Sequence, residues 1–405
     1  MEGAFCMKGM SAKSMAVHIG SAERGSVTEP EVAPIYASAV FKFGSLEQVE
    51  DVWMGKSRGY VYSRMANPSV EAFEEAVDGL EGAAGTVAAS SGMAATCISL
   101  DALLGRDERI VSASVLYGAT RTLIEQDAAR RGASAEFVDI TDLEEVRTAM
   151  EPGARALFCE SISNPLMEVA DIPTLASIAH AAGALLVVDN TFATPMLMRP
   201  LELGADVVIH SCTKYINGHD DIMAGTVSVG GATSGGTGIL AAIRNSRTLL
   251  GPVLSPFEAW LALRGIRTLG VRMEKHCGNA FALAMALKSS HKVTAVHYPG
   301  LDAADPLSAA ARLLADGYGG MLSFNVDGGR EVVDRIVKNL KLAAFVPSLG
   351  SCATTISHPA STSHRGLSEE EKARTGITDG LVRVSVGIEQ ERDIVSDFIG
   401  ALEKL

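Results

Sequence analysis

The chain is poor in aromatic residues, in cysteine and in basic side chains. Of its 405 residues only 5% are aromatic and six are cysteine, and 35 Lys and Arg face 48 Asp and Glu, for a formal net charge of −13. A surface that neutralises nucleic-acid phosphates needs clustered Lys and Arg, so this composition argues against nucleic-acid binding. A small anionic ligand is compatible with it, because a local site can oppose the global charge.

Long apolar runs and paired cysteines are also missing. No run approaches the length of a membrane span, and residues 1–10 lack the basic stretch and apolar core of a signal peptide, so we expect a soluble, cytoplasmic protein with no membrane contact. The cysteines show no CxxC spacing and mostly lie in apolar segments, which favours buried thiols over disulfides or a zinc site. They are Cys6, Cys97, Cys159, Cys212, Cys277 and Cys352.

What the chain does contain is a regular alternation of two patterns. From about residue 85 to 230, short β-branched runs alternate with segments whose apolar residues recur at helical spacing. This predicts an α/β fold with a mostly parallel sheet, helices on both faces, and a ligand site beyond the carboxyl ends of the strands. The predicted strands are 86–90, 109–114, 135–139, 156–161, 184–190, 206–211 and 223–230, and the helices between them are 93–104, 120–131, 142–150 and 172–183.

The flanking regions carry other patterns. Residues 1 to about 60 have little periodicity, the glycine-rich 230–238 resembles a flexible loop, and 255–287 predicts one long helix or a bent pair. Strands at 321–327 and 381–389 with helices at 330–340 and 391–402 suit a smaller α+β domain. We therefore divide the chain into an N-terminal arm (1–62), a large domain (63–256) and a C-terminal domain (257–405).

Polar side chains stand directly after the predicted strands. Taken singly, each has an ordinary explanation: Asp and Asn are common turn residues, "SSGM" can be an N-cap, and most lysines are exposed. Together they should converge, because the carboxyl ends of parallel strands meet at one edge of a sheet. They are Ser91, Gly92 and Met93 after the first strand, Tyr117, Asn164 and Asp189 after later ones, and Ser211, Thr213 and Lys214 after 206–211.

This set of groups suits an aldehyde cofactor. A desolvated lysine amine near positive charge has a lowered pKa and can form a Schiff base. In pyridoxal phosphate sites an acid keeps the pyridine nitrogen protonated, while helix N-terminal N–H groups, hydroxyls and an arginine hold the phosphate. We therefore predict pyridoxal 5'-phosphate as the cofactor and Lys214 as the Schiff-base lysine, with Ser211 and Thr213 turned to the phosphate.

The sequence resembles the Cys/Met-metabolism family of pyridoxal-phosphate enzymes, which includes cystathionine γ-synthases, cystathionine γ-lyases, methionine γ-lyases and O-acylhomoserine sulfhydrylases. The resemblance implies the type I, aspartate-aminotransferase-like α/β fold, in which residues 63–256 bind the cofactor. It covers nearly the whole chain. The motifs that carry it are "VAPIYASAVF", "YVYSRMANPS", "SSGMAA", "VLYGAT", "ESISNP", "VVDNTFATP", "RPLELGADVVIHSCTKYINGHDD" and "LVRVSVGIE".

The resemblance implies a role for each matching residue. Lys214 resembles the cofactor-binding lysine and proton shuttle, Asp189 the partner of the pyridine nitrogen, and Tyr117 the ring-stacking tyrosine that acts near the leaving group. Gly92, Met93, Ser211 and Thr213 are similar to the phosphate cradle, and Asn164 to the residue near the ring hydroxyl. Arg383, with Ser348 nearby, is similar to the arginine that binds the substrate carboxylate. Tyr62 and Arg64 resemble the pair that reaches a neighbouring subunit's phosphate, which implies at least a dimer and usually a homotetramer.

Three departures from the family bear on the reaction. Pro347 stands where the cystathionine enzymes commonly carry Glu, Ala119 where methionine γ-lyases commonly carry Cys, and Ala353 where an acid is often found. The reaction is elimination of a sulfur amino acid (methionine or cystathionine) to 2-oxobutyrate, or γ-replacement on an O-acylhomoserine. We favour elimination because the cystathionine-type Glu is missing.

Two other classes of protein compete with this interpretation. "WMGKS" (Trp53 to Ser57) suggests a phosphate loop, but it lacks the earlier glycine and follows a helical segment. A regulatory protein that binds the cofactor without catalysis would lose the lysine, the acid or the arginine, and all three are present. His358 and His364 could ligate a metal, but they have neither helical pairing nor an acidic partner, so we predict no metal site.

Overall fold

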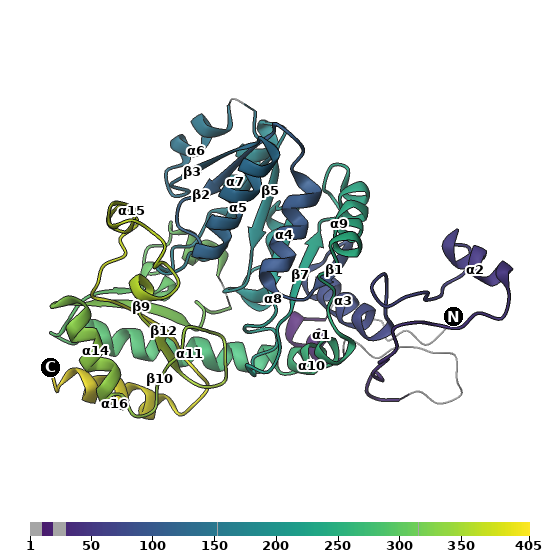
Figure 1. Cartoon of the computed structure of the whole chain (residues 1–405). Coiled ribbons are helices and arrows are strands. Elements are labelled where there is room, and N and C mark those ends of the chain that lie inside the picture. The colour runs from purple at the N-terminus through teal and green to yellow at the C-terminus, as the bar shows by residue number, and fades with distance from the viewer. Residues whose placement is uncertain (1–9, 19–29, 152, 315) are drawn as a thin grey trace.

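The computed structural model describes residues 10–18, 30–151, 153–314 and 316–405. Within these ranges the strands form two sheets, a large one of seven strands and a small one of five. Figure 1 shows the large sheet with its helices above the small one, and an N-terminal arm that projects away from both. None of the helices in the described ranges combines the length and apolar composition needed to cross a bilayer.

The large sheet is mostly parallel, as the alternating pattern predicts. Its strand order is β1-β7-β6-β5-β4-β2-β3, with parallel pairing from β6 through β3, while β7 runs antiparallel to both of its neighbours. Strands β4 and β7 are buried along their whole length and β5 and β6 in all but their last residue, so they read as continuous apolar runs. The strands are β1 (Gly85–Ala89), β2 (Arg109–Ala113), β3 (Ser134–Val138), β4 (Ala156–Glu160), β5 (Leu185–Asp189), β6 (Val207–Ser211) and β7 (Gly225–Val229).

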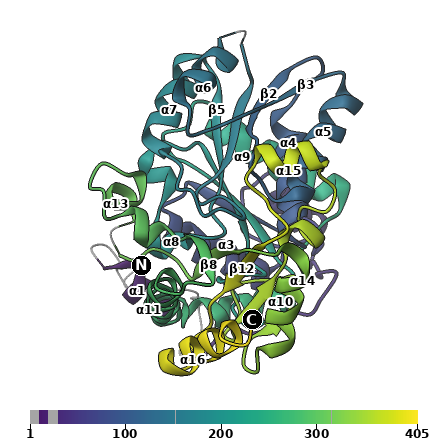
Figure 2. The same ribbon diagram turned by 90° about the vertical axis from the view of Figure 1, so that its left-hand side faces the viewer.

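Helices cover both faces of this sheet. Figure 2 shows α4 and α5 on one side and α6 and α7 on the other, as right-handed crossovers require. Several begin at a side-chain cap: Asn67, Ser91 and Asp142 each accept a backbone N–H of the first turn. The helices of this part are α3 (Pro68–Glu81), α4 (Gly92–Leu103), α5 (Gly118–Arg131), α6 (Leu143–Met150), α7 (Ile172–Ala181), α8 (Thr194–Leu197) and α9 (Gly236–Leu250), with the 3-10 turn η1 (Pro200–Leu203).

Residues 255–287 form the bent pair rather than one long helix. The first helix, α10 (Pro256–Ile266), starts at the cap Ser255, and the second, α11 (Leu269–Lys288), follows after two residues. The first half of α11 packs into the core of the large sheet and its second half, from Ala280, into the core of the small sheet. Because one helix is shared in this way, the division of the chain at residue 256 stays a prediction.

The small sheet contains more strands than the sequence pattern predicts. Its order is β10-β11-β12-β9-β8; β9, β11 and β12 are mostly buried, β8 is partly exposed, and the two residues of β10 are exposed. Its strands are β8 (Val293–His297), β9 (Met321–Val326), β10 (Ala344–Phe345), β11 (Thr355–Ser357) and β12 (Leu381–Ser385). The helical elements around it are α12 (Pro299–Asp302), α13 (Ala309–Leu313), α14 (Gly329–Asn339), η2 (Pro359–Ser361), α15 (Glu369–Arg374) and α16 (Glu391–Leu402).

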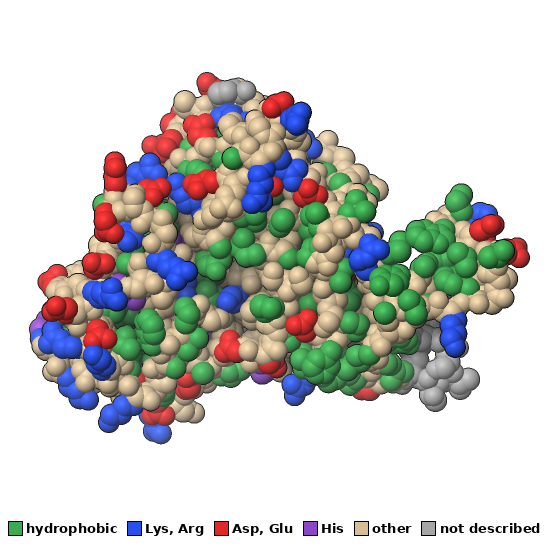
Figure 3. All heavy atoms as spheres, viewed as in Figure 1, with side chains coloured by type: hydrophobic (Ala, Val, Ile, Leu, Met, Phe, Trp, Pro, Cys, Tyr) green, Lys and Arg blue, Asp and Glu red, His purple; other side chains and the backbone are tan. Residues whose placement is uncertain are grey.

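The arm and the glycine-rich segment hold helices that the sequence reading missed. The arm contains α1 (Ala12–His18) and α2 (Leu46–Trp53), and α9 begins inside the predicted loop 230–238. The α2 helix buries none of its residues, and Leu46 and Met54 are 83% and 72% exposed. Figure 3 shows hydrophobic side chains gathered on this projecting part of the surface.

Of the cysteines, Cys159, Cys212 and Cys277 are buried, Cys97 and Cys352 are half-buried, and Cys6 lies outside the described residues.

Candidate active site

A cavity of about 270 Å³ lies at the carboxyl edge of the large sheet, against the small one. Its lining comes from the loops after β1, β2, β4, β5 and β6, together with residues 347–349, 363 and 383. Most of the residues singled out in the sequence therefore line one cavity. The predicted residues that line the cavity are Gly92, Met93, Tyr117, Asn164, Asp189, Ser211, Thr213, Lys214, Ser348 and Arg383.

Two predicted residues lie elsewhere. Tyr62 is the last residue of the arm and Arg64 lies two residues beyond it; neither lines the cavity of its own chain, and the Arg64 guanidinium lies 5.6 Å from the Tyr62 ring centre. Arg64 also donates a hydrogen bond to the Thr248 carbonyl at 2.6 Å. Their expected role at a neighbouring subunit stays a prediction.

Lys214 is held inside the cavity, in the turn after β6. Its Nζ donates to Ser348 Oγ at 3.0 Å. Burial lowers the pKa of Lys214, and the nearby Arg383 guanidinium lowers it further. A larger share of neutral amine makes Lys214 a better nucleophile towards an aldehyde.

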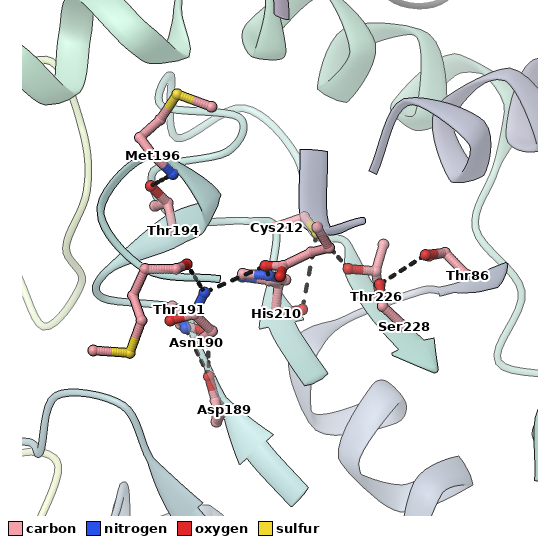
Figure 4. A network of polar contacts seen from close by, with 12 residues as sticks. Thr86, Asp189, Asn190, Thr191, Thr194, Met196, His210, Cys212, Thr226 and Ser228 are labelled. Atoms are coloured by element: carbon pink, nitrogen blue, oxygen red, sulfur yellow. Dashed lines mark hydrogen bonds and ion pairs between the residues drawn. The ribbon is translucent and has the colours of Figure 1, made fainter. Parts of the chain in front are cut away.

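Asp189 ends β5 and faces the same cavity. Its Oδ1 accepts two hydrogen bonds from Thr191, from the backbone N at 3.0 Å and from Oγ1 at 2.5 Å. The Thr191 Oγ1 in turn accepts the backbone N–H of Ser211 at 2.8 Å, which ties the ends of β5 and β6 together. Figure 4 shows Asp189 and Thr191 at the end of β5, near His210 of β6. Burial raises the pKa of Asp189, so a cationic ring nitrogen at this carboxylate would be strongly favoured.

The N-terminus of α4 forms the opposite end of the cavity. Ser91 caps this helix by accepting the Ala94 N–H at 3.1 Å, which leaves other first-turn N–H groups directed outwards. Glycine is needed next to the cap, because a Cβ on Gly92 would lie 2.6 Å from the Ser211 Cβ. A helix N-terminus flanked by the Ser211 and Thr213 hydroxyls suits a phosphate group.

Arg383 enters the cavity from the middle of β12. Its Nη1 donates to Asn164 Oδ1 at 2.9 Å and its Nη2 to the Ser348 carbonyl at 3.3 Å. Burial lowers the pKa of Arg383 to about 10. A buried guanidinium held from two sides is suited to pairing with a substrate carboxylate.

The sequence reading missed Glu160, the last residue of β4. Its carboxylate accepts the Tyr117 N–H at 2.8 Å and the Asn164 N–H at 3.0 Å. Burial, together with the charge of the adjacent Asp189, raises its pKa to about 8. The available signal was position, because Glu160 is the one acid inside the apolar run "ALFCES" and pairs in register with Asp189.

The two histidines considered as metal ligands have hydrogen-bond partners instead. His358 contacts Ser361 Oγ at 2.8 Å and the Asp379 carbonyl at 2.9 Å, and His364 contacts Ser363 Oγ at 2.9 Å and the Leu116 carbonyl at 3.1 Å. Both rings therefore form hydrogen bonds that connect loop residues.

The lining fits pyridoxal 5'-phosphate. The helix N-terminus with its two hydroxyls suits the phosphate, the buried carboxylate of Asp189 suits the pyridine nitrogen, and the amine of Lys214, whose pKa is lowered, suits the aldehyde.

Comparison with known proteins agrees with this chemistry. A family model described as "Cys/Met metabolism PLP-dependent enzyme" matches residues 13–403. The chain is 38% identical to an L-methionine γ-lyase of Fusobacterium nucleatum, over 98% of this chain and 100% of that protein. It is also 38% identical to an O-succinylhomoserine sulfhydrylase of Pseudomonas aeruginosa, over 98% and 97%. Among solved structures, a cystathionine γ-synthase of Xanthomonas oryzae superposes with a TM-score of 0.90 at 35% identity, over 97% and 98% of the two chains.

Proposed function

The chain belongs to the Cys/Met-metabolism family of PLP-dependent enzymes, and from this premise we propose that it catalyses the α,γ-elimination of a sulfur amino acid, methionine or cystathionine. The products are 2-oxobutyrate, ammonia and a thiol, with one water consumed and the Cγ–S bond broken. Pyridoxal 5'-phosphate is the cofactor of the family, and when bound it stores the electron pair left by proton removal from the substrate.

Each of four residues of the cavity has its own task in this reaction. Arg383 binds the substrate carboxylate and so orients the amino acid beside Lys214. The Nζ of Lys214 removes the proton from Cα, gives that proton up, and then removes one from Cβ; the amine must be neutral for each removal, as its lowered pKa favours. Tyr117 donates its hydroxyl proton to the departing sulfur. Asp189 stays ionised at the pyridine nitrogen, held by Thr191.

The observation that carries the choice of elimination is the wall at Pro347. The acids among the lining residues are Glu160 and Asp189, and both lie at the sheet edge rather than on this wall. Pro347 and Leu349 form this wall, and the rest of the lining includes Met223 and the hydroxyl of Ser363. A γ-replacement with a second amino acid needs a group to bind that molecule's ammonium, and a wall without a carboxylate disfavours it. The likeness to an L-methionine γ-lyase also supports elimination.

The second candidate is γ-replacement on an O-acylhomoserine, by sulfide or a simple thiol that needs no ammonium site. The likeness to an O-succinylhomoserine sulfhydrylase at the same identity favours it. An apolar wall is compatible with such a small, uncharged nucleophile.

The deciding experiment measures 2-oxobutyrate released by the holoenzyme from L-methionine, L-cystathionine and O-acetyl-L-homoserine, each with and without added thiol. Rapid release from a sulfur amino acid without thiol supports elimination, and the preferred substrate identifies the lyase. Consumption of the acylhomoserine only in the presence of thiol, with little keto acid, would replace our proposal by the second candidate.

We further propose a cytoplasmic homotetramer in which Tyr62 and Arg64 complete the cofactor phosphate site of a neighbouring subunit. The support is that both residues lie outside the cavity of their own chain, at or just beyond the end of an arm with exposed apolar side chains. The test mixes two inactive variants, Lys214→Ala and Arg64→Ala, by unfolding and refolding them together. Shared sites predict that hybrids regain activity because one site in each hybrid has both residues. No recovery from well-folded hybrids would contradict sharing.

A further inference from the structure

One peptide unit beside the cavity is held at both of its polar groups. The C=O of Leu116 accepts a hydrogen bond from His364 Nε2 at 3.1 Å, and the N–H of Tyr117, in the same peptide unit, donates to Glu160 Oε1 at 2.8 Å. The two side chains come from distant parts of the chain, Glu160 from the end of β4 and His364 from the loop after η2. The backbone that carries Tyr117 is therefore fixed from two directions.

The ring of Tyr117 depends on this backbone for its position. The side chain is 43% exposed, and Tyr117 is the N-cap residue of α5 without a side-chain capping bond. The next residue, Gly118, packs closely against the carbonyl of Ser363, where a Cβ would collide. Since the ring itself has so much exposed surface, its direction follows from where the 116–118 backbone is placed.

Glu160 also connects this peptide unit to Arg383, the residue that we expect to bind the substrate carboxylate. Its second oxygen accepts the Asn164 N–H at 3.0 Å, and Asn164 Oδ1 accepts from Arg383 at 2.9 Å. His364 lies beside the same groups: its pKa responds to Arg383 and to a backbone hydrogen bond with Asn164, and its Nδ1 pairs with Ser363 Oγ at 2.9 Å. Glu160 thus links the tyrosine to the arginine through its second oxygen, whereas the Nε2 bond of His364 holds the Leu116 carbonyl.

The protonation of His364 suits this task. Burial lowers the pKa of His364 to about 4, so near neutral pH the ring is uncharged, Nε2–H donates to Leu116 and Nδ1 accepts from Ser363. Burial raises the pKa of Glu160 to about 8. The charged groups that face Glu160 are Asp189 from β5, which raises its pKa, and Arg383 from β12, which lowers it, and the thiol of Cys159 adjoins it in β4.

We propose that Glu160 and His364 are positioning residues that clamp the 116–117 peptide unit, so that Tyr117 is aimed at the leaving group, and that Glu160 also sets Arg383 through Asn164. The inference rests on the proposed function of the cavity and deepens it. Neither residue needs to touch the substrate for this role.

Four variants test separately the two hydrogen bonds that hold the 116–117 peptide unit. His364→Phe removes the donor to Leu116, while His364→Gln keeps an amide N–H that can donate to it. In Glu160→Gln the side-chain NH₂ cannot accept a backbone N–H, so at most one of the two bonds survives. Glu168→Gln is the matched control, because Glu168 is an exposed acid on the same loop that does not line the cavity.

The first readout needs no cofactor. Amide hydrogen exchange of the apoprotein, followed by mass spectrometry, should show faster exchange of the peptide spanning 115–122 in His364→Phe and Glu160→Gln, with the strands of the large sheet unchanged. The control and His364→Gln should resemble wild type.

The second readout compares two proton transfers in the holoenzyme: exchange of the substrate Cα proton in D₂O, which needs Lys214, and γ-elimination, which also needs Tyr117. We expect His364→Phe to slow elimination about 10- to 100-fold, the effect of a displacement near 1 Å, with Cα exchange within about threefold of wild type and little change in KM. Glu160→Gln should do the same and also raise KM, because Arg383 loosens. His364→Gln should recover most of the lost rate.

Elimination within about twofold of wild type in both damaging variants, an equal loss of both proton transfers, or unchanged amide exchange would each overturn the proposal. If Glu160→Gln does not fold, the His364→Phe and His364→Gln pair decides alone. A wild-type enzyme that releases no keto acid would instead refute the proposed function, and the clamp would then be judged by amide exchange and by thiol-dependent replacement.

Discussion

The two sheets contribute to the cavity in different ways. In the large sheet the parallel strands β2, β4, β5 and β6 all end at one edge, and each delivers its polar group from the end of the strand or the loop beyond it. In the small sheet β12 runs antiparallel to both neighbours, so strand ends alternate between edges. Its contribution comes from Arg383, in the middle of β12 between Ser323 and Ser357 on the flanking strands.

The difference shows two ways of fixing a functional group. Loops at a common edge bring many groups together, and they need cross-links such as Thr191 to Ser211 or Glu160 to Tyr117 to hold them. A mid-strand residue is placed by the sheet ladder itself, and the neighbours of Arg383 only orient its side chain. Substitutions at the edge should therefore alter the chemistry, and substitution of the mid-strand residue should alter substrate binding.

Lys214→Ala should produce the largest effect. Removing the amine removes both the group that binds the cofactor aldehyde and the base of the reaction, so turnover should fall at least about 1,000-fold and the visible absorbance of the bound cofactor should be lost. Absorbance spectra and keto-acid assays measure these changes, with circular dichroism to confirm the fold. Turnover above about a tenth of wild type would exclude Lys214 as the base.

Arg383→Lys should come next. A lysine keeps the charge but loses the two-pronged pairing with a carboxylate, so kcat/KM should fall about 10- to 100-fold, mostly through KM. Steady-state kinetics measures the split, and Arg330→Lys on the exposed start of α14 serves as the control. A loss confined to kcat would contradict carboxylate binding by Arg383.

The same contrast explains which parts could be predicted from sequence. The polar residues at the edge of the large sheet could be predicted because buried parallel strands appear in the sequence as apolar runs. The residue that follows each run can then be identified directly. Arg383 was assigned only through the family resemblance, because nothing in an alternating strand marks one arginine as functional. Glu160 was missed because it still belongs to its strand, and β8, β10 and β11 because they are short or partly exposed and carry weak patterns.

A buried histidine at the junction between the two sheets should make the stability of the protein depend on pH in the acid range. His276, on α11, is buried, contacts the Val386 carbonyl at 2.6 Å, and has its pKa lowered to about 4 by burial. Because the unfolded histidine has a pKa of about 6.5, the unfolded chain binds more protons between pH 6.5 and 4. The contribution of His276 to stability should therefore be complete above about pH 6.5 and be lost as the pH drops towards 4, as measured by denaturant unfolding.

A substitution that removes this titration tests the assignment. His276→Asn keeps an N–H for Val386 but cannot be protonated, so its stability should depend less steeply on pH in that window than that of wild type. His291→Asn, at an exposed position, is the control and should leave the slope unchanged. An unchanged slope in His276→Asn would assign the acid sensitivity to other groups.

The smallest expected effect is a difference between two serines that cap helices, Ser91 and Ser255. Ser91 caps α4 at the cavity, and Ser255 caps α10 away from it, by similar bonds of 3.1 and 3.2 Å to a backbone N–H. Ser→Ala at either site should cost about 1 kcal/mol of stability, because the lost hydrogen bond is the same. Only Ser91→Ala should also weaken binding of pyridoxal phosphate, measured by titration of the apoprotein, because of the two helices only α4 begins at the cavity, where we expect the phosphate. Equal cofactor affinity in the two variants would mean that Ser91 does not help to shape the phosphate site, and that Gly92, Ser211 and Thr213 form it without the cap.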